Sequence, residues 1–409
     1  MTVPWKVELD RAIDEFFPLA VEIRRHLHAH PEPSGQEVET TSYLRSRLSE
    51  LPGVEVHGDA GATGLIVDPA VPRRGARIAV RADIDALWIQ DAKAVQYRSQ
   101  NDGVMHACGH DCHAATLLGA IASLLEAERV GVLPWPVCWR AVFQPSEETG
   151  HGAREMIERG ALDGVHAILS LHMDPSLPVG KIGVREGTFT AACDEMEIKI
   201  SGRGGHAARP HESIDPIAAA AQLISSIYLF VPRAIDSREP VVVTIGKIVG
   251  GHNPNVIPEE VALRGTLRTL GGPIRERTKD HMRQLARGIA ETSGTQIRVD
   301  FDAGPPGVIN DSELTDLLRQ AAYDVIGSEQ VVDIARPSMG SEDFASYLER
   351  VPGCMFRLGC SLLPEGGPTL HSPMFDIEEP AMKIGAKTLA RALVSWCDPA
   401  RQGKWGRGG

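Results

Sequence analysis

A dense group of potential metal ligands occupies residues 106–113, HACGHDCH. Cys108 and His110 are two residues apart in this segment, immediately before a helical pattern. A thiolate and an imidazole at this spacing can reach one metal ion, or two neighbouring ions through a bridging sulfur. Taken singly, such residues are more often a buried thiol and a structural imidazole. The concentration of Cys, His and Asp in one short segment favours a metal site.

Two adjacent carboxylates form the second candidate group. Glu147 and Glu148 lie in QPSEETGHGA, residues 144–153, after the strand-like WRAVF. Neighbouring residues at the carboxyl end of a strand can point in different directions, so one can bind a metal ion while the other faces a substrate. Metal-assisted hydrolysis needs this division, because one free carboxylate must take a proton from the attacking water. An isolated Glu pair is usually a solvated loop, and the strand before this pair favours the functional interpretation.

Two further histidines follow apolar runs. His172 ends the run AILSL, and His371 lies in TLHSPMFD after the strand-like CMFRLG. Either one alone is as compatible with a structural core histidine as with a ligand. We expect all of these side chains to lie where strands of one large domain pass into loops. One cysteine, three histidines and two glutamates are enough to ligate two divalent ions and leave one carboxylate as a base.

The segments around these residues predict an α/β architecture with helices on both faces of a parallel or mixed sheet. From about residue 185 the order changes to β-α-β-β-α-β, the signature of a ferredoxin-like unit with two helices on one face of a four-stranded antiparallel sheet. Strands and helices alternate again from about residue 310. We therefore predict a large domain in two parts, 1–184 and 300–409, with an inserted domain at 185–299.

Composition narrows the possible partners and location. The chain has 409 residues, of which 43% are hydrophobic and 23% charged, and its formal net charge is -12. An acidic protein without a basic cluster is not expected to bind nucleic acid or an anionic membrane. The first residues lack the apolar stretch of a secretory signal, and no stretch is long and apolar enough to span a membrane. Seven scattered cysteines do not form a disulfide framework, so we expect the reducing cytoplasm.

The ordered motifs resemble the aminoacylase and hippurate hydrolase family of amidohydrolases, which includes N-acyl-amino-acid deacylases and auxin-conjugate hydrolases and is related to zinc-dependent carboxypeptidases. The resemblance runs from about residue 24 to about residue 395. It is carried by RRHLHAHPE, RADIDAL, MHACGHDCH, FQPSEE, GRGGHAARPHESIDPI, NVIPEE, MGSEDFASY and LHSPMFD. It implies a zinc-carboxypeptidase-like catalytic domain, and an inserted ferredoxin-like domain that acts as lid and dimerisation surface of a homodimer, which could pair further into a dimer of dimers.

The resemblance also implies roles for individual residues. The family's metal ligands match Cys108, His110, Glu148, His172 and His371. Glu147 matches the general base, and His206 matches a histidine that reaches into the partner subunit's site and stabilises the oxyanion. Asn255 matches a lid residue near the substrate. The expected cofactor is a pair of divalent transition-metal ions per subunit, Mn, Zn, Ni or Co, because a cysteine ligand disfavours magnesium.

Some positions depart from the family's usual pattern. Trp88 and Asp91 stand in DALWIQD where a proline and a glutamate are common, and we expect them to border the site. Trp88 is compatible with ordinary packing or with an aromatic wall for an acyl or aryl group. We include Trp88 and Met339 among the substrate-binding residues, and these departures leave the identity of the substrate open.

The leading hypothesis is hydrolysis of an N-acyl amino acid or a related small amide. The same metal site could also serve a hydrolytic deaminase of an aryl amine, or a dipeptidase or carboxypeptidase. A cysteine nucleophile, with Cys108 activated by His110, is disfavoured because it leaves His172, His371 and Glu148 unexplained. A binding protein that has lost catalysis is disfavoured because Glu147 and the complete ligand set are present.

Overall fold

The computed structural model describes residues 4–58, 61–363 and 365–402. The chain divides into two compact units. The first comprises Met1–Gly187, Ile309–Ala335 and Asp343–Gly409, and the second comprises Thr188–Val308 and Arg336–Glu342. The second unit differs from the inserted segment 185–299 that the sequence predicts. Strand β13 (Gln296–Ala303) belongs to its sheet, so a boundary at residue 299 would cut through a strand.

A mixed sheet forms the centre of the first unit, with its strands in the order β1-β2-β4-β3-β5-β16-β6-β15. The strands span Val54–His57 (β1), Leu65–Pro69 (β2), Arg77–Asp83 (β3), Trp139–Gln144 (β4), Val165–Pro178 (β5), Ile182–Val184 (β6), Val331–Asp333 (β15) and Gly353–Ser361 (β16). The neighbours β4, β3, β5 and β16 run parallel. In contrast, β1 with β2, β2 with β4 and β6 with β16 pair antiparallel. The predicted α/β class with a mixed sheet is confirmed.

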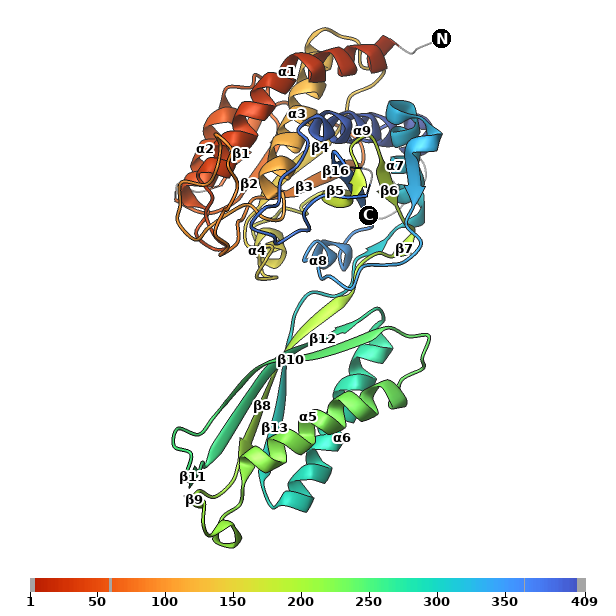
Figure 1. The fold of residues 1–409 in the computed structure, drawn as a ribbon. Helices are drawn as coiled ribbons and strands as arrows, with labels where there is room; N and C mark the ends of the chain where they lie inside the picture. Colours follow the sequence, from red (N-terminus) through yellow and green to blue (C-terminus); the bar gives the residue numbers. More distant parts are fainter. Residues whose placement is uncertain (1–3, 59–60, 364, 403–409) are drawn as a thin grey trace. The chain divides into compact units, whose positions relative to one another are not determined.

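Helices flank this sheet (Figure 1). They span Pro4–Ala29 (α1), Val38–Ser49 (α2), His110–Arg129 (α3), Gly152–Glu158 (α4), Ser312–Ile326 (α7), Ala345–Leu348 (α8), Pro380–Trp396 (α9) and Pro399–Gln402 (α10). Helix α3 contacts α1 and α9 as well as β3 and β5, and most of its side chains are buried. A helix that is buried nearly all round belongs to the core. Its first residue, His110, is therefore held at a fixed place beside the sheet.

The central strands are buried on both faces. Every residue of β4 is buried, which fits a parallel strand covered by helices and explains its nearly continuous apolar sequence. The one cation in β4 is paired, because Arg140 donates from Nε and Nη2 to the two carboxylate oxygens of Asp68 at 2.9 and 2.7 Å. These strands form a rigid platform for the residues that follow their carboxyl ends.

The second unit has the β-α-β-β-α-β order that the sequence predicts. Its elements span Ala192–Ser201 (β8), Pro216–Ala234 (α5), Val241–Gly250 (β10), Glu260–Thr269 (β12), Gly272–Ser293 (α6) and Gln296–Ala303 (β13). The strands lie in the order β10-β12-β8-β13, and every neighbouring pair is antiparallel. Helices α5 and α6 contact each other and pack on one face of this sheet (Figure 1). The alternating burial along β8 reflects a sheet with one covered and one open face.

Several short elements complete the chain. Strand β9 (Gly205–His206) pairs with β11 (Val256–Ile257), and β7 (Gly187–Thr188) pairs with β14 (Ile309–Asn310). Two 3-10 turns span Pro210–Glu212 and Ser328–Gln330. By length and composition, α5 is the one helix among the described residues that could cross a membrane. Core helices pass the same test, and the buried residues of α5 pack with the sheet of the second unit.

Candidate metal centre

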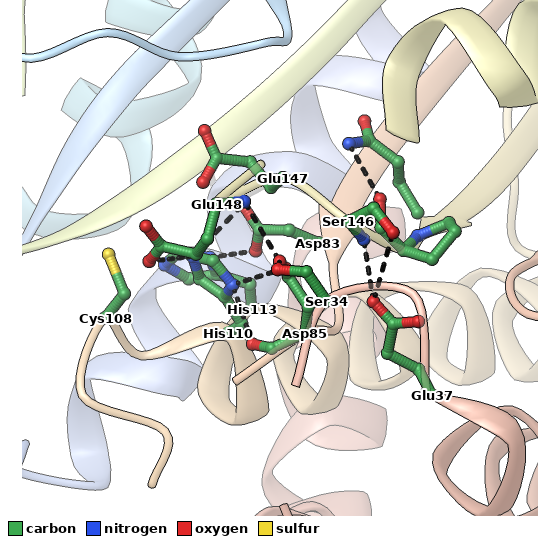
Figure 2. Close-up of polar contacts among 12 residues, drawn as sticks. Ser34, Glu37, Asp83, Asp85, Cys108, His110, His113, Ser146, Glu147 and Glu148 are labelled. Carbon is green, nitrogen blue, oxygen red and sulfur yellow. Dashed lines mark hydrogen bonds and ion pairs between the residues drawn. The ribbon is translucent and has the colours of Figure 1, made fainter. Parts of the chain in front are cut away.

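The predicted ligands come from segments far apart in the sequence. Cys108 lies in the turn before α3, His110 is the first residue of α3, and Glu148 follows the end of β4. The parallel strands β3, β4, β5 and β16 all end at one edge of the sheet, where ligand sites of α/β proteins commonly lie. Figure 2 shows Cys108, His110 and Glu148 close together at this edge.

Two predictions about strand exits were wrong. His172 lies inside β5, because this strand continues to Pro178 alongside β16. His371 lies ten residues beyond the end of β16 at Ser361, rather than at its exit. Its position is fixed instead by its backbone, since the His371 N–H donates to the Ala107 carbonyl at 2.8 Å. This hydrogen bond brings His371 next to the turn that carries Cys108.

Among five groups of described residues that could hold a metal ion, three overlapping groups each contain at least two of the predicted ligands, and within each group all ligand atoms lie within 4.8 Å of one another. These groups are Cys108 with His110 and His172, Cys108 with Glu148 and His371, and His110 with Glu147 and Glu148. The sulfur of Cys108 is 3.5 Å from Nε2 of His172, and Oε1 of Glu148 is 3.3 Å from Nε2 of His371. Cys108, His110 and Glu148 each belong to two of these groups, so the groups share ligands.

Hydrogen bonds orient the histidines for metal binding. Nδ1 of His110 is 3.0 Å from both the carbonyl and Oδ1 of Asp85, and Nδ1 of His172 is 2.8 Å from the Met173 carbonyl. Because Nδ1 of His110 and Nδ1 of His172 each face an acceptor, each neutral ring carries its proton on Nδ1. Nε2 of each ring then has a lone pair for an ion. Such partners on the outer nitrogen are usual for metal-bound histidines. Nε2 of His110 is buried and makes no hydrogen bond within the described chain, as expected of an atom placed to coordinate an ion. Oε1 of Glu148 is also buried and contacts Nε2 of His371, as described above.

Burial shifts the pKa values of Cys108 and His172 toward their uncharged forms. Burial, followed by the charge of Glu148, raises the pKa of the Cys108 thiol well above its ordinary value. Burial, followed by Arg357, lowers the pKa of His172 well below its ordinary value. A coordinated divalent ion would reverse the effect on the thiol, because it stabilises the thiolate directly. The donor set therefore fits transition-metal ions with sulfur, nitrogen and oxygen ligands.

Asp85 is a functional residue that the sequence did not single out. Its Oδ1 accepts from His110, and its Oδ2 accepts from the Glu148 N–H at 2.9 Å and from the Ser34 hydroxyl at 2.7 Å (Figure 2). Burial alone would raise the pKa of Asp85, but the hydrogen bond and charge of His110, with the other donors, hold this pKa below its ordinary value. One buried carboxylate thus orients two candidate ligands. The spacing of two acids in RADIDAL, at the end of a strand, was the available signal.

Asp83 and His113 form a second supporting pair. Nδ1 of His113 is 2.5 Å from Oδ1 of Asp83, and Nε2 of His113 accepts from the Met173 N–H at 2.9 Å. Both ring nitrogens of His113 are therefore occupied, so it holds β5 beside His172 rather than presenting a lone pair to an ion. The carboxylate of Asp91, which we expect to border the site, accepts from the Lys93 and Ser99 N–H groups and so holds its own loop.

Glu147 lies next to the candidate ligands with a largely buried side chain, 8% exposed. A carboxylate oxygen of Glu147 lies within 4.8 Å of ligand atoms of His110 and Glu148. The Asp343 N–H donates to Oε1 of Glu147 at 3.4 Å, which helps to fix the carboxylate. A buried carboxylate beside a metal-binding cluster can accept a proton from a water molecule activated there.

The predicted substrate-binding residues and His206 are not members of the metal-binding groups. In the first unit, Trp88 is 70% exposed, so it is not a packed core residue. In the second unit, His206 and Asn255 line one pocket of about 460 Å³, where His206 pairs with Val256 across β9 and β11. Met339 also belongs to the second unit, where its carbonyl accepts from Arg268 at 3.2 Å.

Known proteins are similar to this chain in sequence and in fold. The chain is 41% identical over 360 residues to the N-acetyl-L-cysteine deacetylase of Bacillus subtilis (strain 168), which covers 88% of this chain and 84% of that protein. It is 40% identical over 383 residues to an N-acetylcysteine deacetylase of the same organism, covering 93% and 97% of the two chains. The crystal structure of Bacillus subtilis YXEP, described as a dinuclear metal-binding peptidase from the M20 family, has a TM-score of 0.80 at 37% identity and covers 94% of this chain and 99% of that chain.

The family model of peptidase family M20/M25/M40 matches residues 79–395, which is more than half of the chain. This match includes the strands and loops that carry the candidate ligands. The chain therefore belongs to peptidase family M20/M25/M40 and is a hydrolase.

Proposed function

We propose that this protein is a metal-dependent amidohydrolase that removes the acyl group from N-acyl amino acids or related small amides. The observation that carries the proposal is the convergence of Cys108, His110, Glu148, His172 and His371 beside Glu147. Supporting it, two relatives that match nearly the full chain are named N-acetylcysteine deacetylases.

In this proposal the five converging residues would hold two divalent ions, Mn, Zn, Ni or Co. When bound, such ions lower the pKa of a coordinated water molecule and polarise the scissile carbonyl. Asp85 fixes the direction of His110 and the backbone of Glu148, so the ligand geometry is set before metal binding. The thiolate favours borderline and soft ions over magnesium.

Glu147 acts as the general base and then as the general acid. Its carboxylate accepts the proton of the attacking water while the new C–O bond forms at the amide carbon. It later donates that proton to the departing nitrogen as the C–N bond breaks, which releases a carboxylic acid and a free amine. The buried position of Glu147 suits this transfer, because bulk water cannot readily exchange the proton.

His206 is proposed to stabilise the oxyanion in the site of a partner subunit. Its Nδ1 accepts the Ala208 N–H at 3.1 Å, so the neutral ring carries its proton on Nε2. That tautomer presents an N–H donor away from its own backbone, as stabilisation of an oxyanion requires. Asn255, which lines the same pocket, and Trp88 and Met339 are proposed to contact the substrate.

The open edge of the second unit supports a homodimer. Strand β10 ends the sheet, and its Ile248 and Val249 are 61% and 54% exposed. Leu229 and Phe230 of the neighbouring helix α5 are also exposed. An apolar, unpaired edge strand is a template for pairing with another chain. We propose that two copies pair through β10 and α5, which gives the inserted unit its role as lid and dimerisation domain.

The cysteines support a cytoplasmic location. All seven, at positions 108, 112, 138, 193, 354, 360 and 397, are free and buried. Unpaired thiols in a protein of this size are typical of a reducing compartment.

Catalysis by one thiol alone would need no metal, so complete loss of turnover on chelation distinguishes the metal site from a cysteine nucleophile.

The deciding experiment measures release of free amine from N-acetyl, N-benzoyl and indoleacyl amino acids, N-acetylcysteine included, after loading with Mn, Zn, Ni or Co. We expect turnover with at least one ion, loss of turnover after chelation, and recovery on metal return. Ammonia release from aryl amines and digestion of dipeptides separate the deaminase and peptidase alternatives. Absence of amine release from every acyl substrate by the metal-loaded dimer would refute the proposal.

A mixed-dimer experiment tests the role of His206. Variants Glu147→Gln and His206→Ala are each expected to be inactive as homodimers. Dimers that combine one chain of each kind contain one site with both wild-type residues if His206 acts across the interface. We therefore expect partial recovery of turnover on mixing, and no recovery would contradict action across subunits.

A further inference from the structure

We propose that Glu37, which is far from Glu147 and Glu148 in sequence, is a positioning residue that holds the strained backbone of Ser146 and so fixes both glutamates. The inference rests on the proposed function for its catalytic consequence. Its structural part, however, can be tested by metal binding alone.

Strained backbone marks the candidate metal centre. Ser146 and His371 are the two residues other than glycine with a positive φ in the described chain, at 55° and 63°. Side chains with a Cβ rarely adopt this left-handed conformation, which persists only where surrounding contacts impose it. Ser146 directly precedes Glu147 and Glu148, so its φ angle sets the direction in which the chain carries both carboxylates.

The side chain of Glu37 supplies the imposing contact. Its Oε1 accepts from the Ser146 N–H at 2.8 Å (Figure 2). The same oxygen accepts from the Gly35 N–H at 3.0 Å. The residue is completely buried, and its other oxygen, Oε2, makes no hydrogen bond. A carboxyl buried at this depth is costly unless its contacts serve the structure.

Glu37 does not perform the task that its place in the chain suggests. It is the N-cap residue of α2, a position where Ser, Thr, Asp or Asn commonly accepts the free N–H groups of the first helical turn. Its side chain makes no such hydrogen bond. Instead, Glu32 accepts from the Glu39 and Thr40 N–H groups at 3.2 and 2.7 Å, which leaves Glu37 directed toward Ser146.

The two amides on either side of Glu147 are both held by buried carboxylates. Glu37 holds the Ser146 N–H, and Asp85 holds the Glu148 N–H at 2.9 Å. Ser34, from the same loop as Glu37, donates to Asp85. The loop between α1 and α2 therefore provides Glu37, which holds the Ser146 N–H, and Ser34, which donates to Asp85. Glu37 fixes the backbone before Glu147, and Asp85 fixes the backbone after it.

The test compares four variants with the wild type. Zinc affinity is measured by chelator competition, and kcat and KM are measured on an acyl substrate at saturating zinc. Glu37→Ala removes the acceptor, so we expect kcat to fall about tenfold or more and zinc affinity about tenfold, with KM changed less than about twofold. Glu37→Gln keeps an oxygen acceptor for Ser146 and is expected to remain within about threefold of the wild type. Ser146→Gly alone should also remain close to the wild type.

The double variant Glu37→Ala with Ser146→Gly is the decisive one. Glycine adopts positive φ readily, so the turn can keep its conformation without Glu37. We expect it to recover at least about fivefold of both kcat and zinc affinity relative to Glu37→Ala. A purely structural role of Glu37 predicts no such recovery. The matched control is Glu32→Ala, which removes a partly buried helix cap in the same loop and should lower the melting temperature with little change in zinc affinity.

The outcomes separate the two proposals. Equal zinc affinity in the wild type and Glu37→Ala, or no recovery in the double variant, would overturn the positioning role. If the wild type releases amine from no acyl substrate, the proposed function fails, and the zinc affinities still decide the role of Glu37.

Discussion

At the scale of single residues, the candidate metal centre depends on carboxylates that would not themselves bind metal. Asp85 accepts from His110, from the Glu148 backbone and from Ser34 with its two oxygens. An asparagine has one acceptor and one donor at this place, so one of these donors would meet another donor. The geometry of two ligands therefore depends on the charge of one outer residue.

We expect Asp85→Asn to weaken zinc binding about 10- to 100-fold, because partners of metal ligands typically contribute that much. Chelator competition measures the effect. Asp68→Asn is a suitable control, since Asp68 is also a largely buried carboxylate but pairs with Arg140 away from the cluster. Equal losses of zinc affinity in the two variants would indicate general destabilisation instead of ligand orientation.

The role of Glu147 leads to a second prediction at this scale. Glu147→Gln keeps the size of the side chain and removes its ability to take a proton, so kcat should fall by about 10²–10⁴. Metal content, measured by elemental analysis, should stay unchanged, because Glu147 is proposed as a base and not as a ligand. Turnover near the wild-type rate would exclude Glu147 as the base. Glu155→Gln, at a half-exposed position of α4 where the side chain pairs with Arg159, provides the control.

At the scale of elements, the edge strand β10 and helix α5 expose apolar side chains that the second unit does not cover. Val242, Ile248 and Val249 are exposed along β10, and Tyr228, Leu229 and Phe230 along α5. Edge strands of monomeric proteins are usually protected by charges, prolines or bulges. Strand β10 has one lysine, Lys247, and one register irregularity between Ile245 and Lys247, and Ile248 and Val249 beyond this point remain exposed. An edge with this composition is better explained by pairing with a second copy.

We therefore expect Ile248→Glu to convert a dimer into a monomer, because a charge would be buried at the paired edge. Sedimentation measures the change in mass. The monomer should still bind zinc, but it should lose turnover if His206 acts in the partner's site. Val71→Glu, at an exposed apolar position of the first unit, should leave the dimer intact. A wild-type protein that is already monomeric would contradict the proposed interface.

At the scale of the whole molecule, Glu37 links the free energy of unfolding to pH. Burial raises the pKa of Glu37 from 4.5 to about 7, despite opposing hydrogen bonds from backbone N–H groups. Between these values the folded protein binds a proton that the unfolded chain has released. The contribution of Glu37 to stability is therefore fully present below pH 4.5, falls as the pH rises and is lost above about pH 7.

Urea unfolding of the wild type and Glu37→Gln between pH 5 and pH 8 tests this linkage. Glutamine does not titrate, and all other titrating groups are shared, so the difference between the two proteins isolates Glu37. We expect Glu37→Gln to become more stable relative to the wild type as the pH rises, by up to about 3 kcal/mol. A difference that does not change with pH would show that Glu37 ionises at its ordinary pKa.

The sequence by itself determined the class of the fold and the identity of the clustered residues. Long apolar runs such as β4 and strongly periodic helices such as α9 lie where their patterns predict them. Shorter strands, including β1, β6 and β15, were not predicted, because three or four residues carry too little pattern and their pairing partners lie far away in sequence. The boundary of the inserted unit at residue 299 falls inside β13, although the sequence predicts this last strand and the strand pairs with β8 from Gln296 to Ala303.

Only the tertiary structure decided how the clustered residues are held. His172 lies inside a strand that pairs with β16, and the outer nitrogen of His110 is fixed by Asp85. The hydrogen bond from Ser146 to Glu37 joins residues 109 positions apart. Local sequence patterns record which side chains face a core, since burial repeats with the period of a helix or strand. They do not record which distant carboxylate meets a given N–H, because that choice is made by the packing of the elements in space.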